Sequence, residues 1–243
     1  LNDQNGRHQI AVIGYGTMTG GMAMEELNNY GLSNSNLHVI LNDNKIAIDS
    51  NVGAMKEYLT DITASRRYNQ FRNFVWKMMG GDTRYGANSR AIVKQIGNAV
   101  KSTISKRSNL FEAFRFRYFG PTDGHDVTHL VKLLRDLQRI EGPKLLHVIT
   151  KKGKGLESAE KEPTTYHSPG IFDRKTGVIK QSDCKEKLAP KYQHVFGKSI
   201  IELAEQNDKI VGITPAMPTG SSLNMMMSVM PERAFDVGIA EQH

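Results

Sequence analysis

The chain has 243 residues, 39% hydrophobic and 23% charged, which suits one large soluble domain or parts of two. No apolar run reaches the roughly 18–20 residues of a membrane helix, and no signal-peptide pattern opens the sequence, so we expect no membrane segment. The net charge of +7 lies partly in 66–117, which lacks helix-turn-helix, zinc-ligand or aromatic RNA-reading patterns, so we expect no nucleic-acid partner. The single cysteine, Cys184, permits no internal disulfide and suits a cytoplasmic protein.

The first third of the chain predicts a strand–helix–strand unit. Residues 8–14 form a short apolar run ending in glycine, as a buried strand does. Residues 17–31 carry apolar side chains on one helical face, and Gly31 is expected to cap that helix. Residues 37–43 predict a second buried strand. Short connections between these elements indicate a βαβ unit, so the fold class is α/β, with a parallel sheet flanked by helices.

The middle of the chain changes character and then returns to the same pattern. Residues 54–107 are polar and basic, and they predict a helical insertion that covers an edge of the sheet. After it we expect a strand at 116–119, a turn at 120–126, an amphipathic helix at 127–140 and a buried strand at 144–150. These elements form a second βαβ unit.

The last third predicts the start of a second α/β domain. Residues 151–190 show little periodicity and are interpreted as an active-site loop that runs into a linker. A helix, a strand, a helix and a strand are then expected over 192–207, 209–214, 222–230 and 234–239. We therefore divide the chain into part of a first domain (1–168), a linker (169–190) and the start of a second domain (191–243).

A glycine-rich turn, GYGTMTGG at 14–21, lies between the first predicted strand and helix. Glycines there let backbone N–H groups approach a phosphate, although such a turn is equally compatible with a structural role. The spacing is not G-x-G-x-x-G, because position 19 is Thr19, and no Gly-Lys-Ser/Thr follows as in a P-loop.

Asn44 changes this balance, because it follows the next strand, 44 − 15 = 29 residues after the middle of the GYG turn. A glycine turn followed at about this distance by an asparagine at a strand end is the thiamine-diphosphate motif. The diphosphate needs a hard divalent cation, and Mg²⁺ takes octahedral oxygen ligands. The carboxyl ends of parallel strands bring such ligands into one crevice.

Five ordered motifs give the chain a close resemblance to the 1-deoxy-D-xylulose-5-phosphate synthases, transketolase-like thiamine-diphosphate enzymes. They are VIGYGTMTGGMAMEELN, VILNDNKIAIDSNVGA, YFGPTDGHD, GPKLLHVITKKGKG and FDVGIAEQH. The resemblance implies an internal fragment of an enzyme that condenses pyruvate with glyceraldehyde 3-phosphate and releases CO2. That reaction opens the non-mevalonate isoprenoid pathway and feeds thiamine and pyridoxal biosynthesis. It further implies thiamine diphosphate and Mg²⁺ as cofactors, and a cytoplasmic homodimer when full length.

The resemblance assigns cofactor contacts to the two strand-end loops. Gly14, Gly16 and Thr17 would hold the diphosphate, the last two through backbone N–H groups. Asn44 would ligate Mg²⁺ through its side chain and Ile46 through its carbonyl oxygen, and both would border the cofactor.

Two further residues match catalytic positions of the family. His167, in TTYH, matches a histidine that faces the thiazolium and bound substrate. Glu241, in AEQH, matches the glutamate that hydrogen-bonds the aminopyrimidine and so activates the cofactor. The chain departs from the family at Tyr15, where the family has the metal-binding aspartate, and at Leu156, where it usually has tyrosine.

The departure at Tyr15 leaves two interpretations open. The chain is part of a working synthase, or it is a non-catalytic relic or interaction module that keeps the fold without the metal. A nucleotide-binding oxidoreductase is disfavoured, because no acidic residue follows the glycine turn in the ribose-binding context. We expect the isolated chain to be inactive, because the family's other cofactor-binding and phosphate-gripping segments are missing from it.

Overall fold

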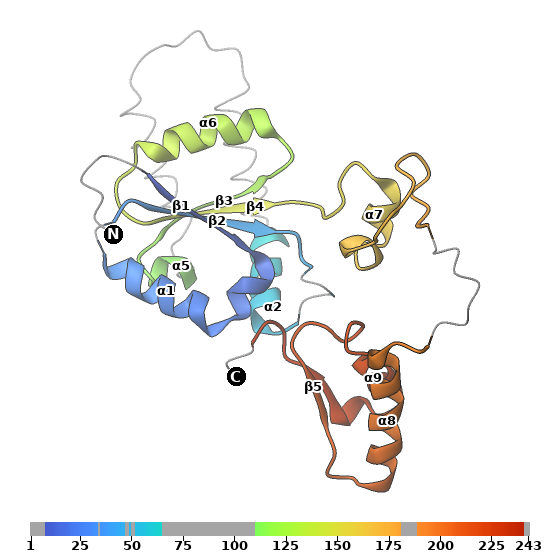
Figure 1. The fold of residues 1–243 in the computed structure, drawn as a ribbon. Coiled ribbons are helices and arrows are strands. Elements are labelled where there is room, and N and C mark those ends of the chain that lie inside the picture. Colours follow the sequence, from blue (N-terminus) through green and yellow to red (C-terminus); the bar gives the residue numbers. More distant parts are fainter. Residues whose placement is uncertain are drawn as a thin grey trace. The chain divides into compact units, whose positions relative to one another are not determined.

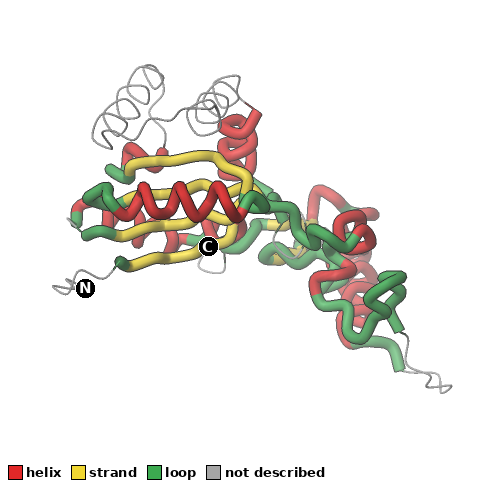
Figure 2. Tube along the Cα trace, turned by 90° about the horizontal axis from the view of Figure 1, so that it is seen from above, coloured by secondary structure: helices red, strands yellow, loops and turns green. Residues whose placement is uncertain are grey.

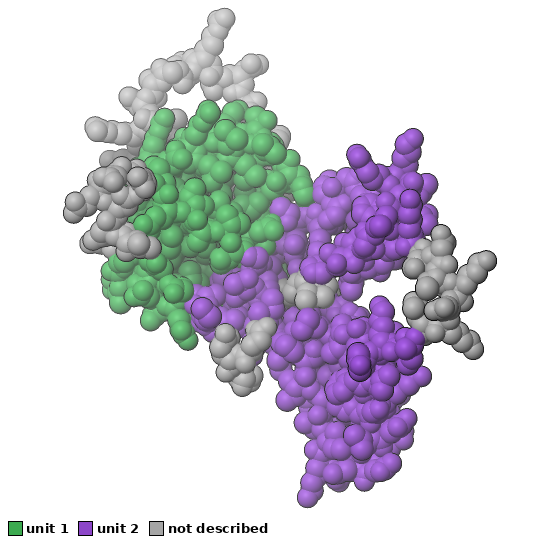
Figure 3. Space-filling model, viewed as in Figure 1, with its two compact units in different colours: residues 1–13, 24–42, 57–149 green, residues 14–23, 43–56, 150–243 purple. Residues whose placement is uncertain are grey.

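The computed structural model describes residues 8–33, 35–46, 49, 52–64, 110–180 and 189–240. The chain forms two compact units, shown in different colours in Figure 3. The first comprises residues 1–13, 24–42 and 57–149, and the second comprises residues 14–23, 43–56 and 150–243. Most of the predicted 54–107 insertion lies outside the described residues. None of the helices in the described ranges is long and apolar enough to cross a membrane.

Four strands form the sheet of the first unit, in the order β1-β2-β4-β3. They are β1 (Gln9–Gly14), β2 (Leu37–Asp43), β3 (Arg117–Asp123) and β4 (Lys144–Ile149). β3 and β4 pair in parallel, as the βαβ prediction requires. The inner strands β2 and β4 are buried along almost their whole length, whereas the edge strand β1 alternates between half-buried and exposed residues. The predicted fold class, a parallel sheet flanked by helices, is therefore confirmed.

Helices cover both faces of this sheet (Figure 1). The helix α1 (Gly21–Leu32) connects β1 to β2, and α6 (Val127–Gln138) connects β3 to β4. These crossovers run in opposite directions along the strand order, so right-handed connections put the two helices on opposite faces. α2 (Ala54–Ala64) and α5 (Leu110–Ala113) lie on the α1 side. Figure 2, from above, shows α6 lying over the sheet with its axis roughly along the strands.

The structure corrects three details of the prediction. The helix expected from residue 17 begins at Gly21, after a 3-10 turn η1 (Tyr15–Thr19). Gly31 does not cap it but lies inside it, where a Cβ atom would collide with the backbone of Phe114, so the glycine serves close packing. β3 continues to Asp123 through the expected turn at 120–126, because a register shift between Phe119 and Thr122 accommodates Pro121 on an edge strand.

After β4, the second unit has two short helices inside the segment that was predicted to be a loop, and then the elements of the predicted helix–strand–helix–strand alternation. They are α7 (Glu157–Lys161), η2 (Thr165–His167), α8 (Tyr192–Gln206), β5 (Gly212–Thr214), α9 (Leu223–Val229), η3 (Pro231–Arg233) and β6 (Ala234–Asp236). β5 and β6 pair in parallel. Ala204 of α8 packs with Leu223, Met226 and Ala234 in a small core. The helix–strand–helix–strand order is confirmed with shorter strands, and the domain limits at 168 and 191 stay predictions.

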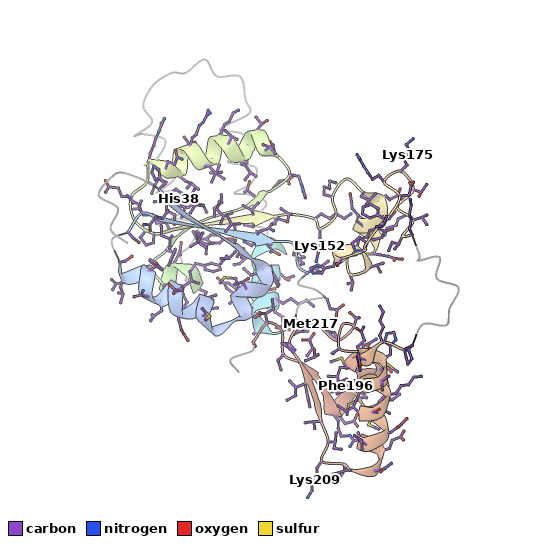
Figure 4. All side chains as sticks on the ribbon, in the orientation of Figure 1. His38, Lys152, Lys175, Phe196, Lys209 and Met217 are labelled. Atoms are coloured by element: carbon purple, nitrogen blue, oxygen red, sulfur yellow. The ribbon has the colours of Figure 1, made fainter. Side chains whose placement is uncertain are left out.

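His38 of β2 is a buried histidine that, in the described part of the chain, lacks a hydrogen-bond partner on one ring nitrogen. It is 3% exposed, and its Nε2 has no hydrogen-bond partner among the described residues. Burial, and then the charges of Lys144 and His8, lower its pKa to about 4. Figure 4 labels His38 on the sheet of the first unit. The folded chain therefore keeps this imidazole neutral under conditions in which an unfolded histidine is protonated.

Acid should destabilise the first unit through His38. Between about pH 6.5 and pH 4 the unfolded chain binds a proton that the folded chain rejects, so the free energy of unfolding falls as pH drops, by about 3 kcal/mol. Urea unfolding of parent and His38→Phe across this range measures the difference. His194→Gln, at an exposed position, is the control and should keep the parental slope. A His38→Phe slope equal to that of the parent contradicts the assignment.

Candidate functional site

The loops that follow three strand ends belong to the second unit. β1, β2 and β4 end at Gly14, Asp43 and Ile149, and the second unit takes up the chain at residues 14, 43 and 150. The backbone N–H of Thr150 donates to the carbonyl of Asp43 at 2.9 Å, which joins two of these loops directly. Carboxyl ends of neighbouring parallel strands are where α/β proteins bind ligands, so this edge is the candidate site.

The glycine turn forms the first wall of the site. Gly16 is buried and Thr17 exposed within η1, and the N–H of Gly20 donates to the carbonyl of Thr17 at 3.1 Å. The Thr19 hydroxyl lies 2.7 Å from the carbonyl oxygen of Gly16 and 3.0 Å from that of Ile239. One side chain therefore holds the glycine turn against a segment 220 residues away in sequence.

Tyr15 is the first residue of this turn, and its side chain is buried. It is 2% exposed, and its hydroxyl has no hydrogen-bond partner among the described residues. Burial, and then the negative charge of Asp43, raise the pKa of Tyr15 to about 12. The phenol is therefore neutral at physiological pH, and its oxygen carries no charge to offer to a cation.

The loop after β2 forms the second wall. Its Asn44 side-chain oxygen accepts from the N–H of Ile46 at 3.1 Å, and Asp43 accepts from the N–H of Lys45 at 3.1 Å. An amide oxygen has two acceptor sites, so Asn44 keeps one after this bond. Asn44 and Ile46 are both half-buried, which leaves them accessible to a small ligand.

A second long-range contact ties this loop to the C-terminal part of the unit. Asp49, which is 9% exposed, accepts from the backbone N–H of Thr219 at 3.0 Å and from its hydroxyl at 2.8 Å. Thr219 lies in the segment between β5 and α9, so the contact joins the loop after β2 to this segment. A side-chain hydrogen bond thus joins each of the two loops to the C-terminal helices and strands: the glycine turn through Thr19, and the loop after β2 through Asp49.

His167 lies at the end of η2, in the segment after β4. Its side chain is exposed, and its Nδ1 atom is 2.7 Å from the Nζ atom of Lys152. Burial lowers the pKa of the Lys152 ammonium. Lys152 is labelled in Figure 4. In the described part of the chain the hydrogen-bond partners of His167 are Lys152 and Thr164, and neither belongs to the glycine turn.

Comparisons with known proteins agree with the motif order. The family model described as 1-deoxy-D-xylulose-5-phosphate synthase matches residues 1–150. A protein of that name from Cytophaga hutchinsonii is 57% identical over 240 residues, covering 99% of this chain and 38% of the relative. Proteins of the same name from Phocaeicola vulgatus and Chlorobaculum tepidum are 48% and 44% identical, with 38% and 37% of their lengths covered.

The chain belongs to the 1-deoxy-D-xylulose-5-phosphate synthase family. It spans 38% of the length of the first of these relatives.

The residues of the glycine turn and the β2 loop fit a diphosphate better than they fit its metal. Gly16 and Thr17 stand at a tight backbone turn with Thr17 exposed, and Asn44 retains a lone pair. The position of the family's carboxylate, however, holds the buried neutral phenol of Tyr15. No group of three or more His, Cys, Asp or Glu that could hold a metal occurs among the described residues. Position 15 therefore supplies no carboxylate ligand for a hard cation.

One predicted site residue lies outside the described part of the chain, and three residues that hold the site together were not predicted. Glu241 lies outside the described residues, but the backbone carbonyl of Ile239, two residues before it, contacts the Thr19 hydroxyl. Sequence reasoning overlooked Thr19, Asp49 and Thr219, whose bonds join segments 220 and 170 residues apart. Their only signal was that they stand inside the quoted motifs or the loop before α9.

Breaking the Asp49–Thr219 contact should destabilise the second unit. Asp49→Ala leaves the Thr219 N–H and hydroxyl without their acceptor, and hydrogen bonds to a charged group are worth about 1.5–3 kcal/mol each. A double-mutant cycle of Asp49→Ala with Thr219→Val, measured by urea unfolding, should give a coupling of about 1–2 kcal/mol. Additive losses would show that the two side chains do not interact in solution.

Proposed function

We propose that this chain is the cofactor-binding segment of a 1-deoxy-D-xylulose-5-phosphate synthase. The full-length protein would condense pyruvate with glyceraldehyde 3-phosphate, with loss of CO2, as a cytoplasmic homodimer in isoprenoid biosynthesis. The observation that carries the proposal is the Thr19 hydroxyl between Gly16 and Ile239. It joins the glycine turn of one family motif to the DVGIAEQH run of another, and the family uses these two motifs for opposite ends of one cofactor.

The chain's residues would divide the work between binding and proton transfer. Backbone N–H groups at Gly16 and Thr17, beside Gly14, would bind the diphosphate, because unpaired N–H groups at a tight turn attract anions. Asn44 and the Ile46 carbonyl would supply neutral oxygen ligands to Mg²⁺. Bound thiamine diphosphate supplies an electron sink for decarboxylation. Glu241 would hold a proton at the aminopyrimidine, and His167 would face the substrate.

The second candidate is a non-catalytic protein of the same fold, and a specific observation favours it. Tyr15 places a neutral side chain where the family has a carboxylate, and its buried hydroxyl bonds to none of the described residues. A hard divalent cation binds anionic oxygen ligands most strongly. The loss of the carboxylate therefore weakens the binding of the metal and of the diphosphate whose charge the metal neutralises. The other described residues of the site are compatible with both candidate functions, so the choice between them depends on Tyr15.

The full-length protein decides between these candidates. Supplied with pyruvate, glyceraldehyde 3-phosphate, thiamine diphosphate and Mg²⁺, it should form 1-deoxy-D-xylulose 5-phosphate, and Glu241→Ala should abolish product formation. If the parent forms no product while Tyr15→Asp does, the chain is a synthase inactivated at one position. If neither forms product although both are folded, the non-catalytic interpretation holds.

Restoring the carboxylate should strengthen cofactor binding. In the full-length protein with Mg²⁺, Tyr15→Asp should make the free energy of thiamine diphosphate binding more favourable by about 1–3 kcal/mol, the range for one charged partner. This corresponds to a Kd about 5- to 150-fold lower. Calorimetric titration measures the change. Tyr15→Phe is the matched control: it keeps the ring and removes the buried, unbonded hydroxyl, so binding should stay at the parental value. Equal affinities of parent and Tyr15→Asp would show that position 15 does not face the metal.

A further inference from the structure

Two adjacent lysines follow β4, and their side chains make different contacts. Lys151 pairs with Glu160 of α7 at 2.5 Å, and the other oxygen of Glu160 accepts from the N–H of Gly155 at 2.9 Å. Lys152 instead reaches His167, with 2.7 Å between Nζ and Nδ1. Of these two like-charged neighbours, Lys152 contacts the histidine and Lys151 pairs with a carboxylate.

The backbone around this pair is closely packed. Gly153 has a φ of 76°, in the left-handed region, and a Cβ atom there would approach Ala159 Cβ to 2.6 Å. This packing holds the turn after Lys152 against α7. After α7, the N–H of Tyr166 donates to the backbone carbonyl of Glu162 at 3.1 Å.

The segment just before His167 is anchored further along the chain. The Tyr166 hydroxyl donates to the carbonyl of Gly177, and its ring packs edge-on against Phe172 with centroids 6.0 Å apart. The N–H of His167 itself donates to Thr164 at 3.2 Å. The backbone of His167 is thus held in place independently of its ring, so the ring's orientation depends on what its nitrogens contact.

The chemistry of the contact fixes which nitrogen of His167 carries the proton. A lysine ammonium has three N–H donors and no acceptor, so Nδ1 of a neutral His167 must be the acceptor of this hydrogen bond. The proton of the neutral ring then resides on Nε2. The hydrogen bond that one ring nitrogen makes sets the state of the other in this way throughout protein chemistry.

We propose that Lys152 is a positioning residue that holds His167 in its Nε2–H tautomer, so that this exposed histidine presents a hydrogen-bond donor at Nε2. A ring held in this state donates to an anionic or carbonyl oxygen and does not accept a proton there. The part of this inference that concerns substrate oxygen rests on the proposed function. The tautomer itself does not, because it depends only on the Lys152–His167 contact.

The test reads the tautomer in the chain without cofactor or turnover. Long-range ¹H–¹⁵N correlation spectra of ¹⁵N-labelled protein are recorded well above the ordinary histidine pKa of about 6.5, where neutral rings dominate. The spectrum of His167→Asn identifies the His167 signals among those of the eight histidines. In the parent, Nε2 should show the shift of a protonated nitrogen and Nδ1 that of an unprotonated acceptor.

Three variants separate positioning from general charge effects. Lys152→Met removes the donor, so both tautomers populate and the two nitrogen shifts move toward each other. Lys152→Arg keeps a cationic donor and should restore the parental shifts. Lys151→Met removes an identical charge one residue away and should leave them unchanged.

The outcomes are distinct from failure of the proposed function. Circular dichroism establishes that each variant is folded. Parental shifts in folded Lys152→Met, or a parent with its proton on Nδ1, overturn the proposal even if the full-length protein is an active synthase. Conversely, the expected shifts support it even if no synthase activity is found.

Discussion

The convergence of strand ends on one edge of the sheet is the constraint on which the site depends. β2 and β4 are neighbours, and the Thr150–Asp43 backbone bond extends their pairing one step beyond the sheet. Parallel strands leave their carboxyl ends, and the loops that follow them, at the same edge. The glycine turn, the Asn44 loop and the Lys152 segment therefore belong to one compact unit although long stretches of chain separate them.

Two side-chain contacts then give that unit its internal order. Thr19 joins the glycine turn to Ile239, and Asp49 joins the β2 loop to Thr219. Both contacts reach the C-terminal α/β elements, whose own core around Met226 is small. A polar contact counts for more where little apolar surface is buried, because the stability of a domain is a small difference between large terms.

Sequence reasoning succeeded where the signal was local. The continuous apolar run at 37–43 coincides with β2, because an inner parallel strand is buried on both faces and needs no alternation. It failed where a distant partner decides the outcome. Gly31 was predicted to be a helix cap. It is in fact a close-packing residue, because the backbone of Phe114, more than 80 residues further along the chain, leaves no room for a Cβ atom.

The candidate site shows the same division. The motifs located Gly16, Thr17, Asn44 and Tyr15 at strand ends, and the structure places them there. No local pattern announces that Lys152 contacts His167, because their spacing of 15 residues follows no helical or strand period. What the sequence could not supply was the pairing of side chains across loops, which depends on how each loop folds back.

The buried phenol at position 15 also has a genetic consequence. Aspartate and tyrosine codons differ only in their first base, so a single substitution separates the two residues. The hydroxyl of Tyr15 bonds to no described residue, but an aspartate here would place a second carboxylate in a buried position near Asp43, so reversion is favoured only where a cation offsets the two charges. In a lineage that needs the metal, such a change would be short-lived. The residue that close isolates carry at this position, tyrosine or aspartate, therefore indicates whether selection still maintains binding of the cation.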